Sequence, residues 1–190
     1  MFEMIKRYVA EIKPVNADLI NSSVTGTAEL IEEGDTLKIS IQATGTPPNM
    51  MHWSHFHGFT DGKKGHVPTM ADDTNGDGII DLPELYAVAG QTMVPFDDAP
   101  HDMHIPHDNY PSSDENGNWT YEFDVPIGKL KAKFKEKFGS EDLRLETRTV
   151  LIHGVPDTID LPDTVLGTVK GYGPHTTLPI GVGEIERVEG

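Results

Sequence analysis

The feature that most restricts the fold of this 190-residue chain is a repeated alternation of apolar and polar residues with a period of two. Leu37, Ile39 and Ile41 alternate with polar side chains, as in a strand with one wet face. A turn at residues 33–35 joins this strand to residues 24–33. The pattern therefore predicts a β-hairpin.

The same period recurs along the chain. Every second residue from Trp119 to Val125 is apolar, after a turn at residues 114–118. Further strands are expected at residues 50–57, 147–154 and 181–188. A total of about seven or eight short strands separated by turns is typical of an antiparallel sandwich or barrel. The sequence therefore predicts an all-β fold.

One amphipathic helix is expected within residues 125–142. There Ile127, Leu130 and Phe134 recur at steps of three and four residues, and lysines fill the other faces. Gly139 can end this helix. Because no linker or repeat interrupts the chain, we expect residues 1–190 to form a single domain.

Residues 73–84, DTNGDGIIDLPE, match an EF-hand-like calcium loop. Calcium takes about six to eight oxygen ligands, and a loop with this spacing can wrap around the ion. Gly78 stands where the turn is sharp. The expected ligands, including the main-chain carbonyl of Ile79, are Asp73, Asn75, Asp77, Ile79, Asp81 and Glu84.

A complete helix–loop–helix hand is not expected, because Pro68 and two glycines precede the loop. Residues 83–90 can form a short helix after it. Sensor hands usually occur in pairs, so an isolated loop indicates a structural ion. A lone loop suits the high calcium concentration outside cells. We therefore expect a secreted or periplasmic protein in its mature form, with a cytoplasmic location left open.

Histidines carry the second chemical signal. His55 and His57 are two residues apart in an expected strand, so their rings emerge on one face and can converge on one metal ion. His153 lies in another expected strand and can add a third nitrogen if the two strands are neighbours. Exposed strand histidines are also common, and this alternative remains open at the level of the sequence.

The stretch HDMHIPHD offers a candidate second metal site, for zinc, formed by His101, His104, His107 and Asp108. A spacing of three residues fits one helical turn. Pro100 and Pro106 interrupt such a turn, so the alternative is a polar loop without metal.

Composition excludes several functions. A net charge of −16 and a pI near 4.8 oppose binding to nucleic acid or anionic membranes and favour binding of divalent cations. The chain has no cysteine, which excludes disulfides, thiolate metal sites and a cysteine nucleophile. Ser22 and Ser54 lack a nucleophile-elbow setting, and no glycine-rich phosphate loop occurs. The N-terminal stretch lacks the unbroken apolar run of a membrane span.

Three stretches, SHFHGFTDG, TRTVLIHGVPDT and GVGEIERV, resemble strands of the copper/zinc superoxide dismutases in the same order. The predicted hairpin also resembles the opening of those enzymes and of chordin-type (CHRD) domains. The resemblance implies a Greek-key barrel of about eight strands. It also implies that His55 and His57 are the first two copper ligands and His153 the last.

The chain departs from that family in ways that bear on activity. His66 is the nearest match to the bridging histidine, but it follows the pair sooner than in the family. The family's zinc loop is replaced by the calcium loop and the histidine-rich stretch. The cysteine bridge is absent, and no arginine precedes the final strand, where the family keeps one to guide superoxide. These departures argue against dismutase activity.

Three functions remain. In the first, the chain is a non-enzymatic metal-binding protein with structural calcium and a histidine site for copper or zinc. In the second, it is a copper-dependent superoxide dismutase. In the third, calcium stiffens an interaction or assembly module, which could form a homo-oligomer.

Overall fold

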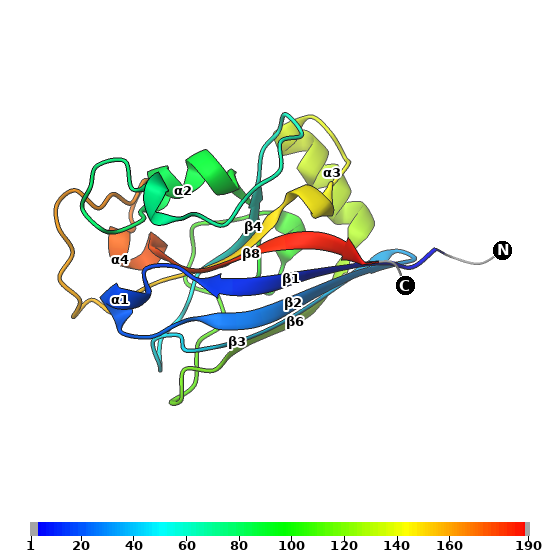
Figure 1. Ribbon diagram of the computed structural model, residues 1–190. Helices are drawn as coiled ribbons and strands as arrows, with labels where there is room; N and C mark the ends of the chain where they lie inside the picture. Colours follow the sequence, from blue (N-terminus) through cyan, green and yellow to red (C-terminus); the bar gives the residue numbers. More distant parts are fainter. Residues whose placement is uncertain (1–3, 189–190) are drawn as a thin grey trace.

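The alternating stretches form one antiparallel sheet of eight strands in the computed structural model, which describes residues 4–188. The sheet is strongly curved, and the start of β1 lies beside the end of β8, where Arg7 pairs with Val188 (Figure 1). Its spatial order is β5-β4-β7-β8-β1-β2-β3-β6. The strands are β1 (Lys6–Pro14), β2 (Thr25–Glu33), β3 (Thr36–Thr44), β4 (Ser54–Gly58), β5 (Gln91–Pro95), β6 (Trp119–Pro126), β7 (Thr149–His153) and β8 (Pro179–Val188). The predicted all-β class is confirmed.

The predicted hairpin is the pair β2 and β3. Glu33 pairs with Thr36 across the turn, where Gly34 has a φ of 58° that favours glycine. β6 pairs with β3 on its other side, and its alternate residues Trp119, Tyr121 and Val125 are buried as expected.

Crossing connections bring strands that are distant in sequence next to each other. β3 pairs with β6, and β4 pairs with β5 and β7. The chain therefore crosses between the two ends of the sheet after β3, after β5 and after β6. The short 3₁₀ helix η2 (Pro100–Asp102) contacts both β5 and β6, the two end strands.

The predicted amphipathic helix is α3 (Ile127–Phe138), which buries Ile127, Leu130 and Phe134 and ends at Gly139. The short helix expected in residues 83–90 is α2 (Leu82–Ala89). The remaining helical turns are α1 (Ala17–Ile20), η1 (Met70–Asp72), η3 (Leu145–Thr147) and α4 (Pro174–Thr177). Within the described range, every helix is too short or too polar to cross a membrane.

Both faces of the β4–β7 part of the sheet are covered. Phe56, Val150 and Ile152 face the main core inside the curved sheet. Leu151 belongs to a second, smaller core together with Leu85 of α2, which lies over the opposite face (Figure 1). The period of two therefore gives these strands an inner face for the main core and an outer face beneath α2.

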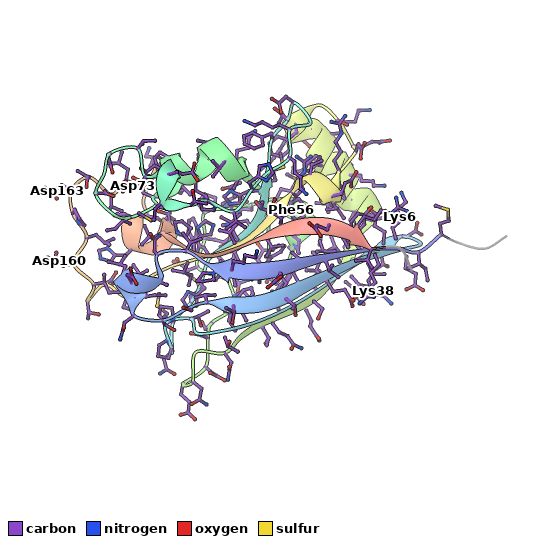
Figure 2. The ribbon with its side chains drawn as sticks, viewed as in Figure 1. Lys6, Lys38, Phe56, Asp73, Asp160 and Asp163 are labelled. Carbon is purple, nitrogen blue, oxygen red and sulfur yellow. The ribbon has the colours of Figure 1, made fainter. Side chains whose placement is uncertain are left out.

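Asp73, Asp160 and Asp163 lie at the end of the molecule away from Lys6 and Lys38 (Figure 2). Asp73, the first residue of the acidic loop (residues 73–84), is therefore at the opposite end of the molecule from the start of β1.

Candidate functional site

Three buried histidines meet on the outer face of β4 and β7. His55 and His57 lie two residues apart on β4, and Phe56 between them faces the main core. His55 lies opposite Leu151 of β7, and His153 follows two residues later. Among residues 4–188, these rings place one nitrogen each within 4.8 Å of the others. The structure thus brings together the three side chains named from the sequence, hereafter the three-histidine group.

Hydrogen bonds to main-chain carbonyls determine which nitrogen of His57 and His153 carries the proton. Nδ1 of His57 donates to the oxygen of Gly90 at 3.1 Å, and Nδ1 of His153 donates to that of Thr177 at 2.8 Å. A carbonyl oxygen can only accept, so Nδ1 is the protonated nitrogen of each neutral ring. Nε2 of both rings therefore keeps the lone pair that binds a metal.

His55 has the opposite tautomer. Its Nε2 lies 2.9 Å from the Tyr110 hydroxyl, which itself donates to the carbonyl oxygen of Ile105 at 2.7 Å. Burial raises the pKa of the Tyr110 phenol, so the hydroxyl keeps its proton. Because that single proton is given to Ile105, the hydroxyl accepts from His55, and Nδ1 of His55 retains its lone pair.

Two of these lone pairs are buried without a partner. Nδ1 of His55 and Nε2 of His153 make no hydrogen bond within the described part of the chain. Nε2 of His57 lies 3.2 Å from the Thr92 hydroxyl. An unsatisfied buried polar group costs about 1–3 kcal/mol. A metal ion shared by the three rings would satisfy the two free nitrogens, so these residues fit a transition metal.

Burial also keeps the three rings uncharged. It lowers the pKa of His153 to about 4. Burial, followed by repulsion from His153, lowers the pKa values of His55 and His57 well below the ordinary range. At neutral pH all three imidazoles are therefore in the deprotonated form that ligation requires.

A cavity of about 10 Å³ adjoins His55 and His153. Its walls include the apolar side chains of Leu82, Ile105 and Val169. A water molecule needs about 10–15 Å³. The space beside the three-histidine group therefore holds at most one small ligand, under the two loops that carry Ile105 and Val169.

The acidic loop forms the second candidate metal group. Carboxylate oxygens of Asp73, Asp77 and Glu84 lie within 4.8 Å of one another. Gly78 has a φ of 81°, which suits glycine at the sharp turn, and its amide donates to Asp73 at 2.8 Å. Ile80 points inward and is buried in the smaller core. The three carboxylates can hold a cation at the surface.

Other residues of the acidic loop have structural partners. Asp81 caps α2 and accepts from the amide of Leu166 at 3.0 Å. The side-chain amide of Asn75 donates to the carbonyl of Thr164 at 3.3 Å. The amide of Ile79 donates to a loop carboxylate at 2.9 Å. These bonds attach the acidic loop to the start of α2 and to residues 164–166.

The structure does not bring His66 to the three-histidine group. Its ring is 60% exposed, and Nδ1 lies 2.8 Å from a carboxylate oxygen of Glu184. The resemblance made His66 the nearest match to a bridging ligand, but the ring contacts a surface carboxylate instead.

Neither group found among the described residues includes the side chains considered for a second site, His101, His104, His107 and Asp108. His104 and Asp108 are exposed. Nε2 of His107 instead lies 2.7 Å from the buried carboxylate of Asp97.

Sequence reasoning missed the groups that orient the three histidines. These are the Tyr110 hydroxyl and the carbonyls of Gly90 and Thr177. Tyr110 is 55 positions from His55, and Thr177 is 24 positions from His153. No local pattern marks a contact at such separations, and a carbonyl oxygen is present at every residue.

The fold and site define an all-β protein with a curved eight-stranded antiparallel sheet and a buried group of three histidines on its outer face. No protein-family model matches the chain, and no curated protein does. Among solved structures, the chain is similar to a SOD-like protein from Bacillus subtilis, with a TM-score of 0.45 and 17% identity over 92% of this chain and 95% of that one. That likeness assigns the chain to no family.

Proposed function

We propose that this chain is a metal-binding protein whose three-histidine group holds copper or zinc and whose acidic loop holds calcium. The observation that carries the proposal is the pair of buried, unpartnered nitrogens, Nδ1 of His55 and Nε2 of His153. Imidazole nitrogen suits copper and zinc better than it suits calcium or magnesium. The ordered likeness to copper/zinc superoxide dismutase strands supports the same two metals.

Storage or presentation of the metal fits the site better than rapid turnover. The adjoining cavity of about 10 Å³ has room for at most one small ligand, and its exposed lining is almost wholly apolar. A substrate would need to displace the loops that carry Ile105 and Val169. The net charge of −16 also repels anionic substrates.

Calcium at the acidic loop is supported by sequence and geometry together. The spacing of residues 73–84 matches a calcium loop, and Asp73, Asp77 and Glu84 converge. The loop leads directly into α2, which lies beside the three-histidine group. Calcium would stabilise this arrangement in a structural role, and the lone loop favours a calcium-rich location outside the cytoplasm.

The test is elemental analysis of protein purified without chelator, followed by copper and zinc titrations of the metal-free protein. We expect about one transition-metal ion per chain. His153→Ala removes a ligand and should abolish this binding. His104→Ala is the matched control, because His104 is exposed and outside the three-histidine group. Equal metal content in both variants would refute the proposed site.

A further inference from the structure

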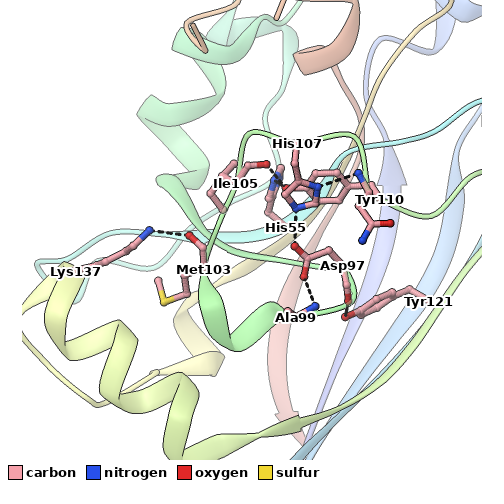
Figure 3. Close-up of polar contacts among 10 residues, drawn as sticks. His55, Asp97, Ala99, Met103, Ile105, His107, Tyr110, Tyr121 and Lys137 are labelled. Atoms are coloured by element: carbon pink, nitrogen blue, oxygen red, sulfur yellow. Dashed lines mark hydrogen bonds and ion pairs between the residues drawn. The ribbon is translucent and has the colours of Figure 1, made fainter. Parts of the chain in front are cut away.

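The segment Asp97–Tyr110 packs against His55 of the three-histidine group and contains the whole histidine-rich stretch that the sequence suggested as a second metal site. In the structure its polar side chains contact one another and His55 (Figure 3). Ile105 also lines the cavity beside His55. The segment therefore has a role at the first site that differs from binding a second ion.

Tyr110 is the point at which this segment touches a candidate ligand. Its hydroxyl accepts from Nε2 of His55 and donates to Ile105, so it fixes both the orientation and the tautomer of the His55 ring. Without the hydroxyl, the buried Nε2 would lose its hydrogen-bond partner. The proton could then move to Nδ1, the nitrogen that has no partner in the structure.

A second pair holds Tyr110 in place. The His107 ring stacks on the Tyr110 ring, with centroids 4.5 Å apart and planes at 8°. Nδ1 of His107 accepts from the amide of Asn109 at 2.9 Å, so Nε2 carries the proton and donates to Asp97 at 2.7 Å. The other carboxylate oxygen of Asp97 accepts from the amide of Ala99 at 2.9 Å. Both oxygens of this buried carboxylate are thus used to hold the segment.

The segment is also tied to the body of the protein at two other points. The Tyr121 hydroxyl of β6 donates to the carbonyl oxygen of Asp97 at 2.7 Å. Lys137 of α3 donates to the carbonyl oxygen of buried Met103 at 2.7 Å. These bonds place the segment by contacts to β6 and α3 (Figure 3).

From this geometry we infer that Tyr110 is a positioning residue for the metal site, which presents Nδ1 of His55 to the ion, and that the Asp97–His107 pair holds Tyr110 for this purpose. The inference rests on the proposed function, since it assumes that the three-histidine group holds a metal. Groups that hydrogen-bond a ligand histidine typically change metal affinity by about 10- to 100-fold when they are lost.

The first test compares Tyr110→Phe with Tyr121→Phe. Both variants keep the ring and lose a buried hydroxyl that donates to a carbonyl of the same segment, but only Tyr110 contacts His55. Nitrogen-15 NMR of the metal-free proteins reports the His55 tautomer. We expect Tyr110→Phe to lose the pure Nε2–H form and to bind copper or zinc about 10- to 100-fold more weakly. Tyr121→Phe leaves the Tyr110–His55 contact in place, so it should keep the parent tautomer and weaken metal binding much less than Tyr110→Phe.

Either an unchanged His55 tautomer or an unchanged affinity in folded Tyr110→Phe would overturn the inference. The tautomer arm uses metal-free protein and so tests Tyr110 even if the parent protein takes up no transition metal. Failure of the parent protein to take up a transition metal would contradict the proposed function and not the role of Tyr110.

The second test examines the Asp97–His107 pair with a double-mutant cycle. His107→Ala removes the stacked ring and the bond to Asp97, and it should weaken metal binding in the parent protein. In a Tyr110→Phe background the same change should have a smaller effect, because both act through the orientation of His55. Full additivity of the two changes would show that His107 does not act through Tyr110.

Discussion

Buried histidines in this protein differ in what their nitrogens contact. His52 has Nδ1 at 3.0 Å from the carbonyl oxygen of His153 and Nε2 at 2.9 Å from that of Pro47. It is buried as fully as His55 and His57, but each of its nitrogens faces a main-chain carbonyl oxygen. What the ring nitrogens face, and not burial alone, therefore distinguishes a candidate ligand from a structural histidine.

The shifted pKa of His153 predicts how the metal-free protein responds to acid. Its folded-state pKa of about 4 is below the unfolded value of 6.5, so the unfolded chain binds more protons between these limits. The free energy of unfolding should therefore fall as pH is lowered from 7 to 5, by about 2 kcal/mol for this one group. Urea denaturation at several pH values measures the slope.

His153→Gln is the control for this pH effect, because glutamine does not titrate in the range. The variant should show a shallower slope than the parent protein. Constant stability of the metal-free parent protein between pH 7 and pH 5 would contradict the assignment of neutral, buried rings.

At the level of elements, α2 connects the two candidate metal groups. Asp81 caps its start and forms a reciprocal capping box with Glu84 of its first turn. The helix ends at Gly90, whose carbonyl orients His57. Gly90 has a φ of 88°, and a Cβ there would lie 2.2 Å from the carbonyl carbon of Gly58. Only glycine lets the end of α2 approach β4 so closely.

Removing one carboxylate from the acidic loop should remove the stabilisation by calcium. A ligand at a hundredfold excess over its Kd stabilises the folded state by about 2.7 kcal/mol. Glu84→Gln should lose most of this increment, because position 12 of a calcium loop supplies two oxygens and a charge. Thermal unfolding with calcium and with chelator measures the increment.

Asp114→Asn provides the matched control for the calcium effect. Asp114 lies in another turn rich in Asp, Asn and Gly, where its carboxylate accepts from the amides of Asn116 and Asn118. Its substitution should change the basal stability but keep the calcium increment. An equal melting temperature of the parent protein with calcium and with chelator would refute calcium binding by the acidic loop.

For the whole molecule, we expect the copper-loaded protein to disproportionate superoxide slowly or not at all. The net charge of −16 repels the anion, and the three-histidine group lies under two loops. Unfavourable steering changes encounter rates by about 10- to 1000-fold, so any residual rate should rise with ionic strength. Pulse radiolysis of copper-loaded protein, with His57→Ala as control, measures this rate. A near-diffusion-limited rate that vanishes in the control would establish the enzyme instead.

The fold could be predicted where local patterns are strong. The β2–β3 hairpin, β6 and α3 each show an unbroken period in their apolar residues. β1 was missed as a strand, although Tyr8, Ala10 and Ile12 alternate with exposed or half-buried residues. β5 has only five residues and carries no such period.

For the candidate site as well, the residues marked by local spacing could be predicted, and those that act through distant contacts could not. His55 and His57 could be found from their spacing, and the acidic loop from its template. Tyr110 could not be found, because its role depends on a loop that folds back over β4. Likewise, the sequence suggested His107 as a metal ligand, whereas in the structure its ring contacts Asp97, ten residues earlier. This contact depends on how the loop folds and could not be predicted from the local sequence.

The placement of the histidines on the outer face of β4 has a consequence for how this protein can change over time. Phe56 and its neighbours on the inner face maintain the sheet, whereas His55, His57 and His153 do not belong to the main core. Substitutions that remove the three histidines would therefore leave the main core of the sheet intact, and new ligands could be introduced on the same face. Loss or exchange of the proposed metal ion can thus proceed through folded intermediates, so the ligands on this face of the sheet can change while the fold is kept.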